Sequence, residues 1–253
     1  MTEIRGLYTL WLREVKRYLR DKTRIVSSFF QPLLWLIIFG SGMRFSGTIG
    51  ELSYQEYIFP GIIGQTLLFT SMFMGISVIW DREFGFLKEI LVAPISRVSI
   101  FLGKMLGGST DAVMQGTIIF FLGVLLGVKL DAVALLEALP IMILVTFGLI
   151  SLGLTIASFI ENLESFGVVQ SFINLPLFFL SGALFPIRGE NIPNWLQMAS
   201  NFDPLTYGVD ALRTVILGEA WLPLHPLYFN LAVIGCFDAA MITIGTLAFS
   251  RRK

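Results

Sequence analysis

The sequence predicts an all-α membrane protein, and its composition and the distribution of its apolar residues lead to this class. The chain has 253 residues, of which 55% are hydrophobic and only 14% are charged, whereas soluble domains carry about 25% charged residues. The apolar residues gather in six runs, each close to the roughly 20 residues that a helix needs to cross a bilayer. We therefore expect six transmembrane helices.

The six expected spans are joined mostly by short connections. The first is the shortest and contains Pro32, which predicts a kink whose freed carbonyl neighbouring helices can satisfy. The spans lie near residues 25–43, 57–79, 105–128, 138–160, 167–186 and 226–250. We expect residues 25–253 to form one transmembrane domain and residues 1–24 to form a separate element before it.

Residues 1–24 have the pattern of an amphipathic helix that lies on a membrane surface. Seven cations stand against three acids, and apolar residues recur at helical spacing on the other side, at Ile4, Leu7, Trp11, Val15 and Tyr18. A basic helix with an apolar face lies in the interface and is attracted to anionic headgroups. The alternative is a solvated helix whose apolar face packs on the rest of the protein.

The distribution of cations predicts the orientation of the chain. Cytoplasmic loops carry an excess of Lys and Arg. If the N-terminus is cytoplasmic, fourteen of the eighteen cations lie inside, and the outer segments keep only Arg44, Lys129, Arg188 and Arg213. We expect both termini, and the segment between the second and third spans, to lie in the cytoplasm of a multi-pass protein in the cell (plasma) membrane.

The segment from Asp81 to Gly108, called the island below, is a charged stretch between two apolar runs. On a helical wheel its apolar residues share one broad face, namely Phe84, Phe86, Leu87, Ile90 and Leu91, with Lys88 and Glu89 opposite. Asp81 and Glu83 favour the N-terminal end of such a helix, and Pro94 cannot continue it. The sequence predicts a short amphipathic helix from about residue 83 to 93.

The longest outer connection, Ile187 to Leu224, contains apolar stretches that are too short to span. Residues 194–200 have a helical pattern, Asp203 and Pro204 indicate a turn or helix start, and residues 206–217 are apolar at helical spacing. The stretch is rich in Trp, Leu, Ile and Tyr, so disorder is not expected. Short helices that dip into the outer leaflet fit this pattern best.

Several kinds of site are excluded or not expected. The formal net charge is zero, which argues against nucleic acid as a partner. Cys236 is the single cysteine and His225 the single histidine, so we expect no disulfide, metal site or catalytic centre. The chain has no Gly-x-x-x-x-Gly-Lys-Ser/Thr motif, so we expect no nucleotide or other cofactor site, and energy must come from a partner or a gradient.

Two acids and one amide inside the predicted spans are candidate substrate-path residues. Asp238 lies 13 residues from both His225 and Arg251, or about 20 Å along a helix, which places it near the midplane. Asp111, with Gln115 one turn further, is nearer the cytoplasmic side. These acids would belong to a substrate or proton path, or would be packing contacts that bond to Ser or Thr of a neighbouring helix.

Two stretches together resemble the type-2 family of ABC transporter permeases, the membrane subunits of ABC exporters (the type V exporter fold). The island resembles the family pattern E-x-x-G-x-x-x-x-L-x-x-x-P-x-S-R-x-x-x-x-x-G-K, with the glycine slightly shifted, at Glu83, Gly85, Leu91, Pro94, Ser96, Arg97, Gly103 and Lys104. The outer stretch is similar at Ser181, Gly182, Phe185, Pro186, Pro193, Trp195, Pro204, Leu205, Thr206, Tyr207, Asp210 and Arg213. Asp203 stands where the family usually has Asn, and both residues favour turns.

The resemblance implies a permease subunit that pairs as a dimer, expected to be a homodimer, with each copy docked on a separate ABC ATPase subunit that binds ATP and Mg. The helix at 83–93 would be the coupling helix that contacts the ATPase, through Glu83, Phe84, Leu87, Lys88, Glu89, Leu91 and Pro94. The outer re-entrant segment would include Pro186, Pro193, Pro204, Tyr207 and Arg213.

The resemblance further implies an exporter of drug-like, lipid-like or glycan substrates, and the sequence does not decide between these classes. It implies no enzymatic activity of the chain itself. The alternative interpretation is a gradient-driven secondary transporter that uses the midplane Asp238. Such carriers contain inverted repeats, and no convincing repeat relates residues 25–128 to residues 138–250.

Overall fold

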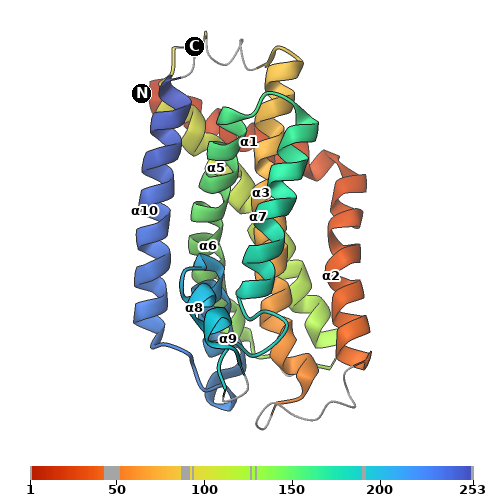
Figure 1. Cartoon of the computed structure of the whole chain (residues 1–253). Coiled ribbons are helices and arrows are strands. Elements are labelled where there is room, and N and C mark those ends of the chain that lie inside the picture. Colours follow the sequence, from red (N-terminus) through yellow and green to blue (C-terminus); the bar gives the residue numbers. More distant parts are fainter. Residues whose placement is uncertain are drawn as a thin grey trace.

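The computed structural model describes residues 2–42, 52–86, 92, 94–125, 127–128, 130–189 and 192–251. Within these residues the regular elements are helices, packed as a bundle (Figure 1). Five helices are long and apolar enough to cross a membrane: α3 (Tyr54–Glu83), α5 (Arg97–Leu125), α6 (Ala132–Phe159), α7 (Leu163–Leu180) and α10 (Leu227–Arg251). The all-α class is confirmed for this part of the chain.

Five of the six predicted apolar runs thus coincide with helices of membrane-spanning length. The first run lies in α2 (Lys22–Gly42), whose apolar stretch, Ile25–Phe39, is shorter. A sixth span therefore stays a prediction. The helix predicted within residues 1–24 corresponds to α1 (Thr2–Arg20), and α2 begins directly after Asp21. The place of α1 in the membrane interface stays a prediction.

Helix α3 is the central element of the bundle. It contacts α2, α5, α6, α7 and α9, and its side chains are buried along most of its length. Its start is fixed by a capping box, in which the Ser53 hydroxyl accepts from the Glu56 backbone N–H and the Glu56 carboxylate accepts from the Ser53 backbone N–H. Gly61 and Gly75 face backbone atoms of Ala183 and Gly153, where a side chain would collide, so glycine permits this close packing.

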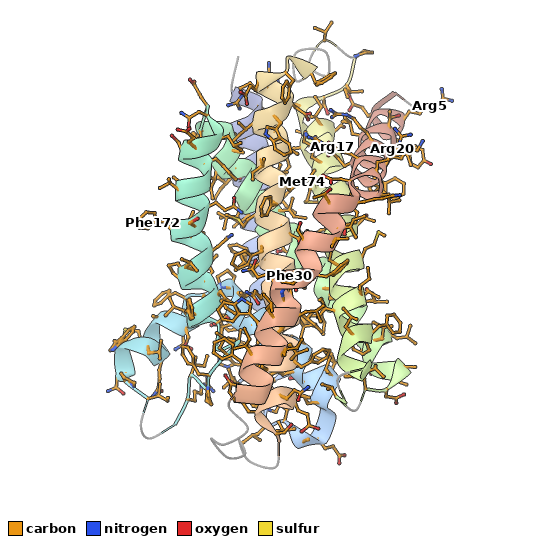
Figure 2. The ribbon with its side chains drawn as sticks, turned by 90° about the vertical axis from the view of Figure 1, so that its right-hand side faces the viewer. Arg5, Arg17, Arg20, Phe30, Met74 and Phe172 are labelled. Atoms are coloured by element: carbon orange, nitrogen blue, oxygen red, sulfur yellow. The ribbon has the colours of Figure 1, made fainter. Side chains whose placement is uncertain are left out.

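The two ends of the bundle differ in chemistry. At one end, called the charged end below, α1 runs across the bundle, and the end of α3, the start of α5 and the end of α10 meet (Figure 1). Figure 2 shows Arg17 and Arg20 at this end, whereas Phe172 of α7 points away from the bundle. The opposite end carries α8 (Asn194–Asn201), α9 (Pro204–Leu217) and the short 3-10 helix η2 (Gly218–Ala220). The beginning of α1 and the end of α10 both lie at the charged end (Figure 1).

Two short helices, α8 and α9, lie in the outer connection where the sequence predicts helical segments, and their position in the outer leaflet stays a prediction. Asp203 is the N-cap of α9, with its Oδ1 accepting from the Leu205 backbone N–H at 2.9 Å, and Pro204 takes the first helical position. This is the arrangement that an Asp-Pro pair favours, because the carboxylate satisfies a free amide and proline has no N–H to lose.

The island differs from the prediction at both edges. Helix α3 continues through Glu83, so Asp81 and Glu83 lie at the C-terminal end of a span instead of the N-terminal end of a separate helix. A turn at Phe84 and Gly85, with Gly85 at φ 79°, ends the helix. Helix α5 begins at Arg97, earlier than the predicted 105.

Candidate functional site

A cluster of five charged residues joins three helices at the charged end. This ionic cluster consists of Arg13, Glu14 and Arg17 of α1, Asp81 of α3 and Lys104 of α5. Lys104 is 0% exposed, and its Nζ donates to Asp81 Oδ2 at 2.6 Å and to Glu14 Oε1 at 3.2 Å. The two Arg13 Nη atoms donate to the two oxygens of Asp81, at 2.8 and 3.2 Å.

The geometry of the ionic cluster makes it a rigid connection. A bidentate arginine–carboxylate pair fixes orientation as well as distance. The hydrogen bond that Arg13 donates to Asp81 raises the pKa of the Arg13 guanidinium above its usual value, against the opposing effect of burial. Buried pairs contribute little net stability, but loss of one partner leaves an uncompensated buried charge that costs about 3–5 kcal/mol. The cluster therefore resists separation of α1, α3 and α5.

Two further side chains tie the two flanks of the island to other helix ends. Arg82 Nη1 donates to the Ile160 carbonyl at 2.8 Å, at the C-terminal end of α6, and Arg97 Nη1 donates to the Ser250 carbonyl at 3.0 Å, at the end of α10. Cations at helix C-termini are favourable because they meet free carbonyls and the negative end of the helix dipole. A displacement of the island would thus reach α6 and α10 directly.

At the start of α5, Ser96 caps the helix, with its Oγ accepting from the Ser99 backbone N–H at 3.1 Å, and Glu3 of α1 binds both serines. Its carboxylate accepts from the backbone N–H and the hydroxyl of Ser96 and from the hydroxyl of Ser99. The Ser99 hydroxyl, followed by the Ser96 amide and hydroxyl, lowers the pKa of Glu3. An anion at a helix N-terminus compensates the positive end of the dipole, so α1 is attached to α5 at both Glu3 and Lys104.

Two glycines of α5 bring α1 close enough for these bonds. A side-chain carbon at Gly103 would lie 2.8 Å from Cβ of Leu10, and one at Gly107 would lie 2.6 Å from Cβ of Glu14. Both distances are too short for a carbon contact. The Gly-x-x-x-Gly spacing therefore serves helix packing here, as small residues commonly do in membrane proteins.

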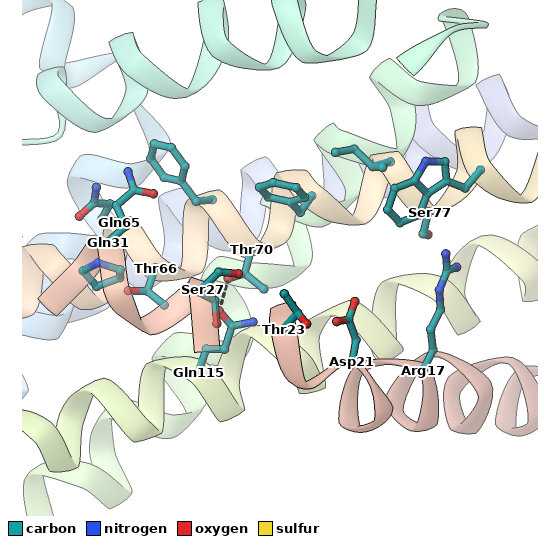
Figure 3. Close-up of a pocket in the computed structure, with 16 residues that line it drawn as sticks. Arg17, Asp21, Thr23, Ser27, Gln31, Gln65, Thr66, Thr70, Ser77 and Gln115 are labelled. Atoms are coloured by element: carbon teal, nitrogen blue, oxygen red, sulfur yellow. Dashed lines mark hydrogen bonds between the residues drawn. The ribbon is translucent and has the colours of Figure 1, made fainter. Parts of the chain in front are cut away.

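A second feature is a groove of about 460 Å³ that runs along α3 beside α2 and α5, called the polar groove below (Figure 3). Its walls include Phe69, Phe73 and Trp80 of α3. Uncharged polar side chains also line it, namely Thr23, Ser27, Ser28, Gln31, Gln65, Thr66, Thr70, Ser77 and Gln115. Arg17 and Asp21 line it near the charged end (Figure 3). A concave site with apolar walls and a few polar groups is typical of ligand binding.

The predicted substrate-path residues separate in the structure. Gln115 lines the polar groove, where its Oε1 accepts from Thr70 Oγ1 at 2.8 Å. Asp111 is buried and does not line the groove. Asp238 is 4% exposed and packs against Gly148 of α6, and neither carboxylate oxygen has a hydrogen-bonding side-chain partner within the described part of the chain.

The outer segment is held by a buried arginine. Arg213 donates through Nη2 to the Gly182 and Ala183 carbonyls, at 2.7 and 3.1 Å, and its guanidinium lies 3.9 Å from the centroid of the Tyr57 ring. Desolvation lowers the pKa of Arg213, against attraction by the groups around it.

The other predicted outer residues also lie in this packed region. Tyr207 donates to the Asn201 carbonyl at 2.7 Å and stacks on His225. Pro186 is half-buried, and Pro193 is the N-cap of α8. The contacts of Arg213 and Tyr207 are structural, since they connect α9 to α3 and to the segments on either side of it.

The predicted ATPase-contact residues are only partly covered. Glu83 and Phe84 lie at the end of α3, and the Phe84 side chain is 70% exposed. Pro94 lies shortly before α5. Leu87, Lys88, Glu89 and Leu91 lie outside the described residues, so the helix predicted there stays a prediction.

Sequence reasoning missed the ionic cluster and most of the polar groove. Lys104 counted as a loop cation, although Gly103 and Gly107 beside it marked a close helix contact. Gln31 and Gln65, each within an apolar run, were the available signal for the groove, because an amide within a membrane span needs a polar partner.

Comparisons with known proteins agree with the resemblance to ABC transporter permeases. Residues 5–217 match the model of the family described as ABC-2 type transporter. The chain is 33% identical over 224 residues to ycf38 of Cyanophora paradoxa, named a transport permease, covering 87% of this chain and 77% of the relative. It is 25% identical over 231 residues to nodulation protein J of Rhizobium leguminosarum bv. viciae, covering 90% and 87%.

A third relative carries a name with a substrate class. The Escherichia coli (strain K12) protein YbhR, named a multidrug ABC transporter permease, is 28% identical over 197 residues, covering 76% of this chain and 53% of the relative. The family match covers most of the helical bundle, including the ionic cluster and the polar groove. The chain therefore belongs to the ABC-2 type transporter family and is a multi-pass membrane transport permease.

Proposed function

We propose that the chain is the membrane-spanning subunit of an ATP-driven exporter, and that it works as a dimer with two separate ATPase subunits. The observation that carries the proposal is the ionic cluster. Both flanks of the island are joined through Asp81 and Lys104 to one another and to α1. A force applied to the island would move α1, α3 and α5 together instead of bending the island alone.

The ATPase-contact surface in this proposal is the exposed part of the island. Phe84 offers a large apolar side chain beside Glu83, and the sequence continues with the predicted apolar face and the charges Lys88 and Glu89. Apolar anchors supply affinity at such an interface, and rim charges supply orientation. Nucleotide-driven closure of the ATPases would move this surface, and the ionic cluster would pass the motion to the spans.

The remaining parts of the proposal rest on the family and on the cation distribution. The positive-inside bias favours cytoplasmic termini in the plasma membrane, with the island on the ATPase side. A homodimer follows the family resemblance, and the name of YbhR favours a drug-like substrate. A gradient-driven carrier built on Asp238 is less well supported, because Asp238 packs against α6 and does not line the polar groove.

Affinity purification from native membranes in mild detergent tests the proposal. The tagged chain should capture a soluble ABC ATPase, and Phe84→Ala should reduce the captured amount. Phe202→Ala is the matched control, because Phe202 is 84% exposed and follows α8 at the opposite end of the bundle. Absence of an ATPase, or equal capture by both variants, would contradict the proposed coupling.

A further inference from the structure

A stripe of basic residues runs along one side of α1, next to the side that packs on α5. Leu10 and Glu14 are buried on that packed side, against Gly103 and Gly107. The residues of the stripe are three and four apart, so they share one side of the helix; they are Thr9, Leu12, Arg13, Lys16, Arg17 and Arg20. Together with Asp21 they line an open hollow of about 780 Å³, called the basic hollow below.

The basic hollow has an excess of positive charge. Its lining contains four cations, Arg13, Lys16, Arg17 and Arg20, against the single carboxylate of Asp21. Lys16 and Arg20 are exposed, and neither forms an ion pair with a residue in the described part of the chain. A guanidinium presents its N–H donors in a fork that matches the oxygens of a phosphate. The hollow is therefore suited to an anion.

The ionic cluster, which shares Arg13 and Arg17 with the basic hollow, has a surplus positive charge of its own. It contains three cations and two acids, and Arg17 is the cation held least tightly. Its Nη1 lies 3.6 Å from Asp81 Oδ1, which is longer than a hydrogen bond. Arg13 and Lys104 donate to the same carboxylate at 2.8 and 2.6 Å. An anion that binds Arg17 from the hollow would balance the charge of the cluster.

The surroundings of α1 favour a lipid headgroup as this anion. On the side that adjoins the basic hollow, α1 exposes large apolar side chains: Ile4 is 78% exposed, Tyr8 56% and Leu19 50%. Ile4 and Tyr8 also line a mainly apolar hollow of about 550 Å³ between α1, α5 and α6. A helix with an exposed apolar side next to a basic side lies among lipid headgroups, with its apolar side toward the acyl chains. A soluble anion would leave that apolar side uncovered.

We propose that the basic hollow binds the headgroup phosphate of an anionic phospholipid in the leaflet at the charged end. Arg17 and Arg20 would hold the phosphate, with Arg13 and Lys16 beside it. A zwitterionic lipid carries a cationic group that offsets its phosphate, so it would bind less tightly. The inference goes beyond the proposed function, because this lipid is neither the transported molecule nor the ATPase: it is a bound component that stabilises the contact of α1 with α3.

Native mass spectrometry of the full chain in detergent micelles, with lipid titrated in, tests this inference. The probes are dioleoyl phosphatidylglycerol, dioleoyl phosphatidylcholine, which has the same acyl chains, and glycerophosphoglycerol, which is the first headgroup without acyl chains. The first phosphatidylglycerol should bind at least tenfold more tightly than phosphatidylcholine, and glycerophosphoglycerol should not displace it. Arg20→Gln should weaken this binding by about fivefold, the effect of one cation at an anionic membrane surface.

Two further variants separate the site from a general attraction between a basic helix and anionic lipid. Arg5→Gln is the matched control, because Arg5 is an exposed cation of α1 that does not line the basic hollow, and it should leave the first binding step unchanged. Arg17→Gln removes the surplus charge of the ionic cluster, so phosphatidylglycerol should raise its unfolding temperature less than that of the wild type. Arg20 is exposed and outside the ionic cluster, so Arg20→Gln tests the site even if Arg17→Gln fails to fold.

Two sets of results would overturn the inference. Equal binding of the two lipids, or equal weakening by Arg5→Gln and Arg20→Gln, would show only a general attraction to the surface of α1. Displacement of phosphatidylglycerol by glycerophosphoglycerol at a similar concentration would make the hollow a site for soluble phosphodiesters. Because no ATPase is present in this assay, neither result bears on the proposed coupling.

Discussion

Removal of the Lys104 charge is the most informative single perturbation of the ionic cluster. Lys104 is fully buried, with its Nζ 2.6 Å from Asp81 Oδ2 and 3.2 Å from Glu14 Oε1. Lys104→Met preserves most of the side-chain length, so the change is mainly electrostatic. Loss of one partner of a buried ion pair costs about 3–5 kcal/mol. Asp81 keeps Arg13, so we expect a loss near the lower limit, about 3 kcal/mol.

The assay is unfolding of the chain in detergent micelles or nanodiscs, followed by tryptophan fluorescence. Lys16→Met is the matched control, because Lys16 is exposed on the same helix as Glu14, and an exposed substitution changes stability by within about 0.5 kcal/mol. Adding Glu14→Gln to Lys104→Met should restore part of the loss, because one uncompensated carboxylate is then neutral. Unchanged stability of Lys104→Met would refute the reasoning that the cluster is a buried, mutually dependent unit.

Three other perturbations test separate parts of the structure. Burial raises the pKa of Asp203 from 3.8 to about 8, so the folded state binds an extra proton between these pH values. The free energy of unfolding therefore falls as pH rises through that window, by up to about 1.4 kcal/mol per pH unit. Asp203→Asn keeps the cap acceptor and should unfold at a higher temperature than the wild type at pH 8, with the difference shrinking toward pH 4. Gly107→Val places side-chain carbon against Glu14 and should loosen α1, measured as faster tryptic cleavage after the arginines of α1. The Ser99 hydroxyl and its neighbours lower the pKa of Glu3, so the ionised Glu3 carboxylate stabilises the folded protein above pH 4.5, and this stabilisation is lost as pH falls through the lowered pKa. The melting temperatures of the wild type and Glu3→Gln should therefore differ at pH 6 and converge at pH 3.

Elements with a strong local signal could be predicted from the sequence. The spans follow from runs of apolar residues, and five of them coincide with helices of spanning length. The start of α9 follows from the Asp203-Pro204 pair, because capping is a property of a few adjacent residues. The N-terminal helix follows from its amphipathic spacing, although its buried face includes Leu10 and Glu14 as well as the predicted Tyr18.

Features that depend on helix rotation and pairing could not be predicted. A hydropathy pattern predicts that the third span begins after Lys104, because a charge is unfavourable within a span. In the structure α5 begins earlier, at Arg97, and Lys104 lies inside it, paired with acids of α1 and α3. Likewise, Gln115 was named a candidate path residue together with Asp238, and only Gln115 faces the groove. Which face of a span meets a neighbour is set by packing between helices, and apolar composition does not encode it.

The measurement that most directly tests the central claim is substrate-stimulated ATP hydrolysis by the complex of the chain with its ATPase in proteoliposomes. Glu83→Arg and Phe84→Ala alter the end of α3 at the exposed edge of the island. If the island receives the motion of the ATPase, both variants insert normally into the membrane but lose stimulated hydrolysis and export. Stimulated hydrolysis at the wild-type rate in both variants would contradict the account.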